Sequence, residues 1–456
     1  MKQCKKNLQL WTGFCLGATL FLSIPRASQA AEPAVPTVPS PAIRTGDRTG
    51  DKVLKLEDAV RIAVENHPRI KTAKERVGAQ QAVVGQQLGA YYPTISFNNV
   101  YRSSTASGTT GVSAEGFDFF SSQATFNFVL YNFGKREGTV QSAKETLDAT
   151  RYNFRTSVDE VILAVKEAIY RYLGLRALVR VREEAVKNRE LLVRQAQGFY
   201  EVGTRPKIDV VRAESNLYNA RADLITAQNG VKVGWATLKN AMGVRDLPEQ
   251  PVAEEVSMAP IAVTLDQARE SAFASRPELK SFEAQRRAQD QQIATARRGH
   301  LPDIIFDALY GRRHTSNDNG NTFPLLPTWQ VQLSLNFPIF DGFRTTNRVE
   351  EALRNYHSIR AQEEEGKQQV ALEVESSYFR LIEAEERIKA TEAAEKAAKE
   401  NLDLANGRYQ VGVGSIIEIT DAQTLHTDAQ TNHIRSIYDY KIAEAQLIRA
   451  VGSPQP

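Results

Sequence analysis

Two hydrophobic periods alternate along this chain. After Pro93 and again after Pro302, apolar residues occupy every second position, which is the period of a strand with one apolar face. The alternating positions are Ile95, Phe97 and Tyr101; Ala124, Phe126, Phe128 and Leu130; Ile304, Phe306, Ala308 and Tyr310; and Trp329, Val331, Leu333, Leu335, Phe337 and Ile339. A loop over 103–116, rich in Ser, Thr and Gly, separates the first two runs. We predict two strand pairs with strands of about ten residues, long enough to cross the apolar layer of a bilayer.

The remaining stretches carry the longer period of an α-helix. From about Lys135 to Tyr200 there is no proline and little glycine, which predicts about 100 Å of helix at about 1.5 Å per residue. Apolar residues here and in the following helix recur at steps of three and four, the spacing of a coiled-coil seam. The seam positions are Val158, Ile162, Val165, Ile169 and Tyr172, then Val210, Ala213, Leu217, Ala220, Leu224, Ala227 and Val231. Such helices are expected to pack side by side rather than around a compact core.

The whole pattern occurs twice, at a constant offset of 209 residues. The offset pairs Leu56 with Leu265, Ala59 with Ala268, Pro68 with Pro277, Pro93 with Pro302, Phe97 with Phe306, Val161 with Val370, Tyr200 with Tyr409, Ala213 with Ala422 and Gly243 with Gly452. A duplication of this length indicates one architectural unit used twice. We place the first repeat at 53–243 and the second at 263–452, with a proline-bearing acidic linker at 244–262 and a tail at 453–456.

Residues 1–30 have the composition of a secretory signal peptide. A basic start at 2–6 precedes an apolar run over 8–24, and small residues at 28–30 match a cleavage site. A flexible leader rich in Pro and Thr is expected over 31–52. The alternative is a retained membrane anchor, which the shortness of the apolar run disfavours.

Removal of this segment changes the expected charge and chemistry. Both cysteines, Cys4 and Cys15, lie within it, so the mature chain should lack disulfides, thiolate catalysts and cysteine metal sites. Four of the 57 basic residues lie there too, leaving 53 against 54 acidic residues, a formal charge of −1. This is not the basic field that nucleic-acid binding needs, so no nucleic-acid partner is expected. Enzyme signatures such as a phosphate-binding glycine loop, a nucleophile elbow or a zinc-binding helix are missing, so we expect neither catalysis nor a cofactor.

Four strands are too few to close a barrel in a membrane. The smallest membrane barrels have about eight strands, and an open sheet edge in lipid leaves backbone groups unpaired at a cost of several kcal/mol each. No later apolar run is long enough for a spanning helix, so a mature chain that crosses a membrane must cross it as strands. A half-buried soluble hairpin would show the same alternation. The pattern therefore predicts an exported oligomeric channel whose long helices continue the barrel wall as a tube.

Four segments carry a resemblance to a known family. They are LEDAVRIAVENHPRI at 56–70, YEVGTRPKIDVVRAESNLYNARADL at 200–224, YQVGVGSIIEITDAQ at 409–423 and the FDG turn at 340–342. With these segments the chain resembles the TolC-type outer-membrane efflux family, the outer membrane factors. The resemblance implies a mainly α fold with a membrane β-barrel contribution, built from a duplicated strand hairpin and long helical hairpin. It also implies a homotrimer with a twelve-stranded outer-membrane barrel and an α-helical periplasmic tunnel.

The resemblance implies a passive exit duct in contact with outer-membrane lipid. Such a duct belongs to a tripartite efflux or type I secretion system, and a periplasmic adaptor couples it to an inner-membrane pump of the RND or ABC type. The alternative is a periplasmic coiled-coil scaffold, similar to the adaptors and without a pore. Two hairpins in register, each beside a strand pair, argue against the scaffold.

The resemblance also implies which residues close the periplasmic end. Glu418 and Asp421, six and nine residues after Gly412, hold the positions of two acidic rings. Such rings attract cations and resist ionisation of all their members at once. Tyr409 matches the tyrosine of an entrance latch, and Asp209 is its expected partner. For Glu418 there is an alternative, because it could complete a capping box at a helix start.

Two further features of this end follow from the resemblance. The turns Val202-Gly203-Thr204 and Val411-Gly412-Val413 match the helix-hairpin tips at which adaptors are thought to dock, although their glycines could simply permit a left-handed turn. The latch arginine of the family, expected two residues after Gly412, is Gly414 here, and Arg205 holds the corresponding place in the first repeat. We therefore expect the closed state to be held differently.

His426 and His433 fall on the seam stripe of the last helix, seven residues apart. A metal site or a pH switch is one interpretation. Two helical turns separate them, which is too far for both to ligate one ion comfortably. Polar seam residues that set the register of the coiled coil are the alternative.

Overall fold

The computed structural model describes residues 53–106, 115–254, 263–317 and 325–452. The predicted signal peptide, leader and tail lie outside the described residues, as does the second half of the linker. Every described residue belongs to one structural unit, Asp51–Pro456.

The elements of the first half of the chain recur in the second half. The first set is α1 (Leu56–Asn66), α2 (Pro68–Leu88), the short 3-10 helix η1 (Gly89–Tyr91), β1 (Thr94–Ala106), β2 (Glu115–Tyr131), α3 (Lys135–Glu201) and α4 (Lys207–Ala241). The second set is α5 (Leu265–Ser275), α6 (Pro277–Arg297), η2 (Arg298–His300), β3 (Asp303–Asn317), β4 (Leu326–Asn336), α7 (Arg344–Gln410) and α8 (Ile416–Val451). Both ends of α1, α2 and α3 recur 209 residues later in α5, α6 and α7. The repeat boundaries at 53–243 and 263–452 stay predictions, because the structure gives the ends of elements rather than of units.

The sequence explains where several helices begin. Pro68 and Pro277 occupy the first position of α2 and α6, where a missing backbone N–H costs nothing. Helix α5 starts at a capping box between Thr264 and Gln267. The long helix predicted from about Lys135 to Tyr200 is α3, which ends at Glu201.

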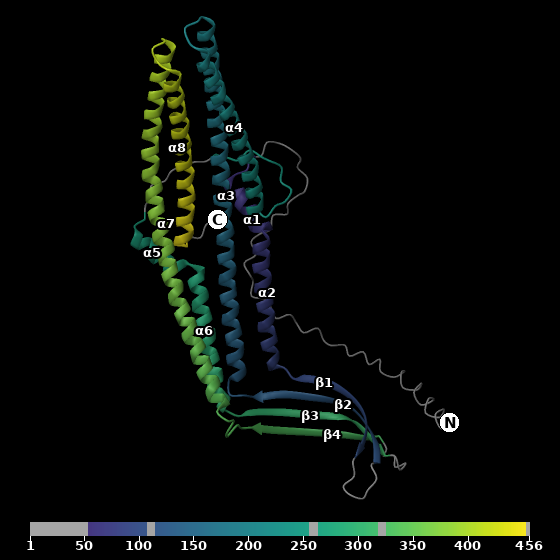
Figure 1. Ribbon diagram of the computed structural model, residues 1–456. Helices are drawn as coiled ribbons and strands as arrows, with labels where there is room; N and C mark the ends of the chain where they lie inside the picture. Colours follow the sequence, from purple (N-terminus) through teal and green to yellow (C-terminus); the bar gives the residue numbers. More distant parts are fainter. Residues whose placement is uncertain (1–52, 107–114, 255–262, 318–324, 453–456) are drawn as a thin grey trace, which may run out of the picture. The chain divides into compact units, whose positions relative to one another are not determined.

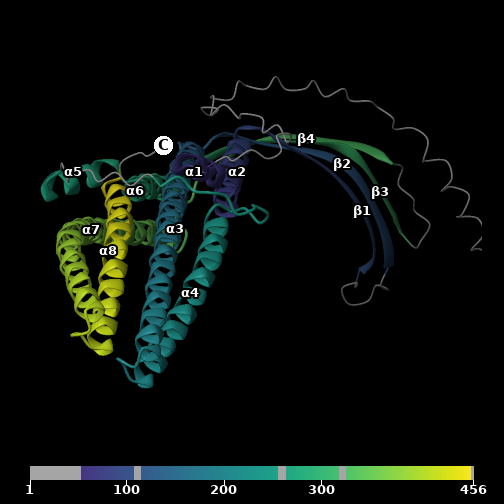
Figure 2. The same cartoon turned by 90° about the horizontal axis from the view of Figure 1, so that it is seen from above.

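The four strands form one antiparallel sheet in the order β1-β2-β3-β4 (Figure 1). The two predicted hairpins are therefore joined through β2 and β3, which come from different repeats. Figure 2 shows that the strands curve together. Within the described residues β1 and β4 each pair along one side only, so both are edge strands.

The register separates an apolar face from a polar face. Phe97, Ala124, Tyr310 and Trp329 lie directly across from one another on the four strands. Thr94, Asn127, Asp307 and Gln332 form a matching polar row. Trp329 is 73% exposed and most apolar residues of β1 and β4 are exposed as well, so the apolar face lacks a cover within one chain. Within the described ranges, no helix combines the length and the apolar content that crossing a membrane requires.

Two strand boundaries differ from the sequence prediction. Strand β1 extends to Ala106 and strand β2 already begins at Glu115, so part of the predicted loop over 103–116 is strand. Strand β4 ends at Asn336 rather than Ile339. Its partner β3 starts at Asp303, which pairs with Asn336, and Pro338 has no N–H to donate to a ladder.

The long helices pack in pairs, α3 with α4 and α7 with α8, and α3 also contacts α6 and α8. The predicted seam on α3 is confirmed, because Ile162, Val165, Ile169 and Tyr172 are buried and Val158 packs against them. Of the seam positions predicted on α4, Val210, Ala213 and Leu217 are buried, whereas Ala220, Leu224, Ala227 and Val231 are half-buried. The far part of the α4 stripe is therefore only partly covered within one chain.

Candidate functional site: the ends of the two helical hairpins

Both helical hairpins end in a turn that requires glycine. Gly203 and Gly412 have φ angles of 72° and 81°, in the left-handed region. No heavy atom lies within 4 Å of a Cβ placed on either residue, so backbone conformation rather than crowding selects glycine. Val202, Val411 and Val413 beside them are exposed. The predicted docking tips are thus turns that present apolar side chains.

Below the tips, the two hairpins share one apolar cluster. It contains Leu192, Val193 and Ala196 of α3, Val210, Ala213 and Leu217 of α4, Leu402, Ala405 and Tyr409 of α7, and Ile416, Ile419 and Ala422 of α8. Phe199 also packs there, with its ring edge-on to that of Tyr409 at 5.6 Å between centroids. The tips of the two repeats are therefore packed together in a single chain.

Arg205 connects the two tips directly. Its Nη2 donates to the carbonyl oxygen of Gly412 at 2.9 Å and also to that of Gly414. The guanidinium carbon lies 5.5 Å from the centre of the Tyr409 ring, in the range of a cation–π contact. The sequence indicated the position of Arg205 but not these acceptors, because backbone carbonyls carry no sequence signature.

The predicted latch pair is brought close but not joined. Tyr409 is fully buried, and within the described part of the chain its hydroxyl has no hydrogen-bond partner. Burial raises the pKa of the Tyr409 phenol, and the charge of Asp209 raises it further, while Arg205 opposes the shift. Asp209 is itself buried. A latch between Tyr409 and Asp209 stays a prediction.

Gly414 has no room for a side chain. A Cβ at this position would lie 2.9 Å from the backbone nitrogen of Tyr409 and 3.0 Å from the carbonyl carbon of Arg408. Real Cβ atoms almost never approach backbone so closely, so an arginine here would force the turn to shift. This gives a physical reason why the cationic side chain comes from Arg205 instead.

The two predicted acidic residues differ in their surroundings. The Oγ of Ser415 accepts from the backbone N of Glu418 at 3.1 Å, so one half of the expected capping box is present. The Glu418 carboxylate instead forms an ion pair with Nε of Arg408 at 2.8 Å. Asp421 is exposed on the next turn of α8. Its charge acts on buried Arg189, whose pKa is lowered by burial despite that attraction.

The two histidines contact different groups. His426 is buried, its Nε2 has no partner in the described part of the chain, and it lines a cavity of about 260 Å³ with Glu184, Asp403 and Gln423. His433 instead places Nδ1 3.3 Å from the hydroxyl of Thr391. They therefore do not share one site.

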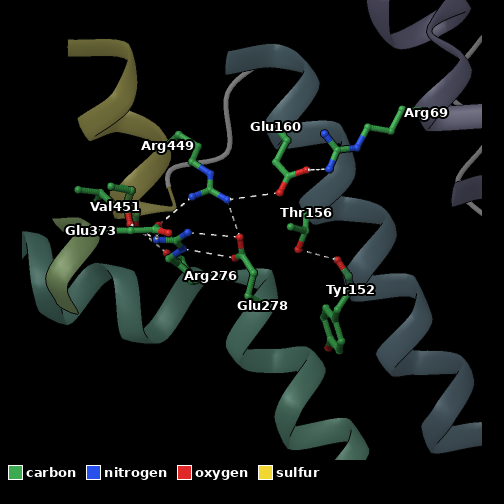
Figure 3. A network of polar contacts seen from close by, with 11 residues as sticks. Arg69, Tyr152, Thr156, Glu160, Arg276, Glu278, Glu373, Arg449 and Val451 are labelled. Atoms are coloured by element: carbon green, nitrogen blue, oxygen red, sulfur yellow. Dashed lines mark hydrogen bonds and ion pairs between the residues drawn. The ribbon is translucent and has the colours of Figure 1, made fainter. Parts of the chain in front are cut away.

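A network of ion pairs was not predicted from the sequence. Its members are Arg69 of α2, Glu160 of α3, Arg276 and Glu278 at the start of α6, Glu373 of α7 and Arg449 of α8 (Figure 3). Arg276 is only 2% exposed and places Nη1 2.6 Å from the Glu373 carboxylate. Arg449 lies 2.8 Å from both Glu278 and Glu373 and 4.0 Å from Glu160. Apart from Arg276 and Glu278, the charges lie far apart in sequence and have no common spacing, so no pattern could have indicated the network.

The duplicated helical hairpins and the shared four-stranded sheet are the fold of outer-membrane channels. In the Campylobacter jejuni CmeC outer membrane channel this fold covers 90% of each chain, with a TM-score of 0.75 and 17% sequence identity. Protein CyaE of Bordetella pertussis is 25% identical over 465 residues, covering 98% of this chain and 94% of the relative. Outer membrane protein TolC of Vibrio cholerae is 25% identical over 403 residues, covering 86% and 89%.

Residues 59–244 and 268–453 each match the outer membrane efflux protein family. The chain belongs to this family. It is an outer-membrane channel protein of the TolC type that extends into the periplasm. Its relatives are channels rather than enzymes, which favours the channel over the pore-less scaffold.

Proposed function

We propose that three copies of this chain form one passive duct through the outer membrane. The observation that carries the proposal is a four-stranded sheet with two open edges, β1 and β4, and an exposed apolar face. Unpaired edges are costly in lipid, and four strands are too few to close a barrel. Three copies would pair β4 of one with β1 of the next, giving twelve strands whose apolar face contacts outer-membrane lipid.

Exposed apolar stripes on the helices support the same assembly. Val211, Tyr218 and Ile225 of α4 are exposed and seven residues apart, as are Leu372 and Phe379 of α7. Seven-residue spacing is the signature of a helix that packs along a partner helix. In a ring of three copies, α7 of one copy would cover α4 of the next and close the periplasmic tunnel.

The periplasmic entrance of this duct would be controlled by the hairpin ends. Asp421 and Glu418 from three copies would form acidic rings that favour cations, with Asp421 dominant because Arg408 pairs directly with Glu418, whereas Arg189 acts on Asp421 only through its charge. Tyr409 and Asp209 would act together as an entrance latch. The exposed valines at 202, 411 and 413, with Gly203, Thr204 and Gly412, would form the surface on which a periplasmic adaptor docks.

The duct itself would supply no reaction and no cofactor. An inner-membrane pump of the RND or ABC type would provide the energy and the choice of cargo, in efflux or type I secretion, through the adaptor. The chain's contribution is then a continuous wall and a gated entrance.

The assembly can be tested with the purified mature protein. We expect light scattering in detergent to give the mass of three copies, and planar bilayers to show discrete conductance steps. A monomer that produces no conductance would contradict the proposal.

A further inference from the structure

The apolar face of the sheet carries a positive charge near one end of its strands. The register divides this face into rows, and the row of Tyr310 and Trp329 is followed by a row that contains Asn99, Ser122, Arg312 and Pro327. We propose that Arg312 binds a phosphate group of the glycolipid in the outer leaflet of the membrane. The inference rests on the proposed duct, whose apolar face contacts outer-membrane lipid.

The direction of the strands places Arg312 at the outer leaflet. Helices join the four strands at one end (Figure 1), and these helices extend into the periplasm, so the opposite ends of β1 and β3, at Ala106 and Asn317, point outward. Arg312 lies nine residues beyond Asp303, the first residue of β3, which is about 30 Å along a strand. A tilt of about 40° reduces this length to a height of about 23 Å, close to the apolar band of a membrane barrel, which is about 25 Å tall.

Aromatic side chains surround this level on the same face. Tyr310 and Trp329, one row closer to the periplasm than Arg312, are 68% and 73% exposed. Tyr101 and Phe120, one row further out, are exposed as well. Membrane barrels carry such aromatic girdles where the apolar layer meets the lipid headgroups. Arg312 therefore lies at headgroup depth, where a charge costs far less than at the centre of the bilayer.

The guanidinium of Arg312 is exposed and available to a ligand. Among the residues that the structure describes, it has no hydrogen-bond or ion-pair partner. The carboxylate of Asp118 lies on the same face, but it accepts a hydrogen bond from the hydroxyl of Tyr101 at 3.1 Å, on the β1 side of β2. Asp307 lies in the polar row of the opposite face. A cation that faces lipid therefore needs an anion from the lipid itself.

A phosphate is the anion that suits this position. The planar guanidinium donates two parallel hydrogen bonds to a phosphate, which fixes its orientation as well as adding strength. Pro327, directly opposite Arg312 on β4, has no polar side chain, so the guanidinium is not engaged from that side. His314 lies two residues further out on the same face and can donate from its ring to the same headgroup. Glycolipids of the outer leaflet carry phosphates on their sugar headgroups at this depth.

The first repeat has no equivalent cation. The offset of 209 residues pairs Tyr310 with Tyr101, so the aromatic residue is present in both repeats. It pairs Arg312 with Ser103, which is uncharged. Each copy therefore has one site of this kind, and the proposed duct has three.

Arg313 offers a matched control on the same strand. It is also exposed, but its guanidinium carbon lies 5.8 Å from the centre of the Phe119 ring, on the polar face of the sheet. In the duct that face lines the lumen, which lipid does not reach. Arg313→Gln thus removes the same charge from the neighbouring position and leaves the proposed site intact.

Native mass spectrometry of the purified mature protein in detergent can count bound lipids, with diphosphoryl lipid A as the probe. We expect the unchanged protein and Arg313→Gln to bind one lipid per copy, and Arg312→Gln to bind about tenfold more weakly. Arg312→Lys should bind with intermediate strength, because an ammonium keeps the charge but loses the paired donors. Lipid A stripped of both phosphates should bind every variant weakly. Equal binding by Arg312→Gln and the unchanged protein, or equal binding of the stripped lipid, would overturn the inference.

Two further arms identify the source of the phosphate and separate this site from the duct. Inorganic phosphate at millimolar concentration should not displace lipid A, because the acyl chains hold the headgroup at the site; displacement would overturn the lipid assignment. The same spectra give the mass of the assembly. A monomer that binds lipid A through Arg312 would support the site and contradict the duct. A trimer that binds lipid A without regard to Arg312 would support the duct and overturn the inference.

Discussion

Asp421 and Glu418 lie one helical turn apart, yet they differ in the charge that each presents. The Glu418 carboxylate is held by Arg408, whereas Asp421 is exposed. We expect Asp421→Asn to lower the ratio of cation to anion permeability several-fold, and Glu418→Gln to have a smaller effect. Reversal potentials in a salt gradient measure this ratio. Equal effects of the two substitutions would show that Arg408 does not offset Glu418.

The ion-pair network around Arg276 gives a prediction about pH. Burial disfavours ionisation of Glu278, but the hydrogen bond and charge of Arg276, together with the charge of Arg449, outweigh it, so the pKa of Glu278 lies below its ordinary 4.5. A carboxylate with a lowered pKa stabilises the fold above its ordinary pKa and loses this contribution as pH falls through the lowered value. The pKa of nearby Asp159 is shifted in the opposite direction, because burial and the charge of Glu278 raise it.

We therefore expect Glu278→Gln to reduce the free energy of unfolding by about 1–3 kcal/mol at neutral pH. The difference from the unchanged protein should shrink as pH falls from 4.5 through the lowered pKa, at which Glu278 of the folded protein itself becomes protonated. Thermal unfolding in detergent, followed by circular dichroism across this pH range, measures the difference. A constant difference at all pH values would contradict the assigned pKa shift.

For single residues, the sequence predicted where a residue lies in the fold better than it predicted which groups that residue contacts. Gly203, Gly412 and Tyr409 could be placed at the hairpin ends, because turns and repeats leave a spacing. The acceptors of Arg205 could not be predicted, since they are backbone carbonyls brought near by folding. The ion pair between Arg408 and Glu418 was also missed, because the residues lie on opposite sides of a turn.

At the scale of elements, the second helical hairpin depends on the backbone conformation of the turn between α7 and α8. Gly412 has a left-handed backbone, whereas Gly407 lies inside α7, and a Cβ placed on either glycine would have no heavy atom within 4 Å. Gly412→Ala should destabilise the fold by about 1 kcal/mol, because alanine is strained in that conformation. Gly407→Ala should stabilise it by up to about 1 kcal/mol, because alanine favours a helix interior. Shifts of opposite sign in the melting temperature are the expected result, and shifts of the same sign would contradict this assignment.

The sequence predicted the helices more accurately than the strands. Periods of three and four, and a long run without proline, set the ends of α3 to within a residue. The ends of β1, β2 and β4 depend on the strands that they pair with, so alternation alone misplaced them. Pairing of β2 with β3 across the repeats was likewise not contained in any local pattern.

In the assembled molecule, the apolar stripe of α4 should decide whether copies stay together. Tyr218→Asp with Ile225→Asp would place two carboxylates in the proposed contact with α7, where charge burial is costly. We expect this variant to run as a monomer in detergent, with the helix content of a single chain retained. Asn219→Asp, an exposed position on the same helix, is the control and should remain trimeric. A trimeric double variant would contradict the proposed packing.

Because the two repeats lie 209 residues apart on one polypeptide, equivalent places in the wall of the proposed duct can carry different residues. A ring built from six copies of a half-length polypeptide would carry the same residue at all six equivalent places. Here Arg205 and Gly414 hold equivalent places on one polypeptide, and only the first has space for a side chain. In the proposed ring, mutation could therefore strengthen or loosen alternate joints independently, so that natural selection could tune how readily the entrance opens without rebuilding the symmetry of the ring.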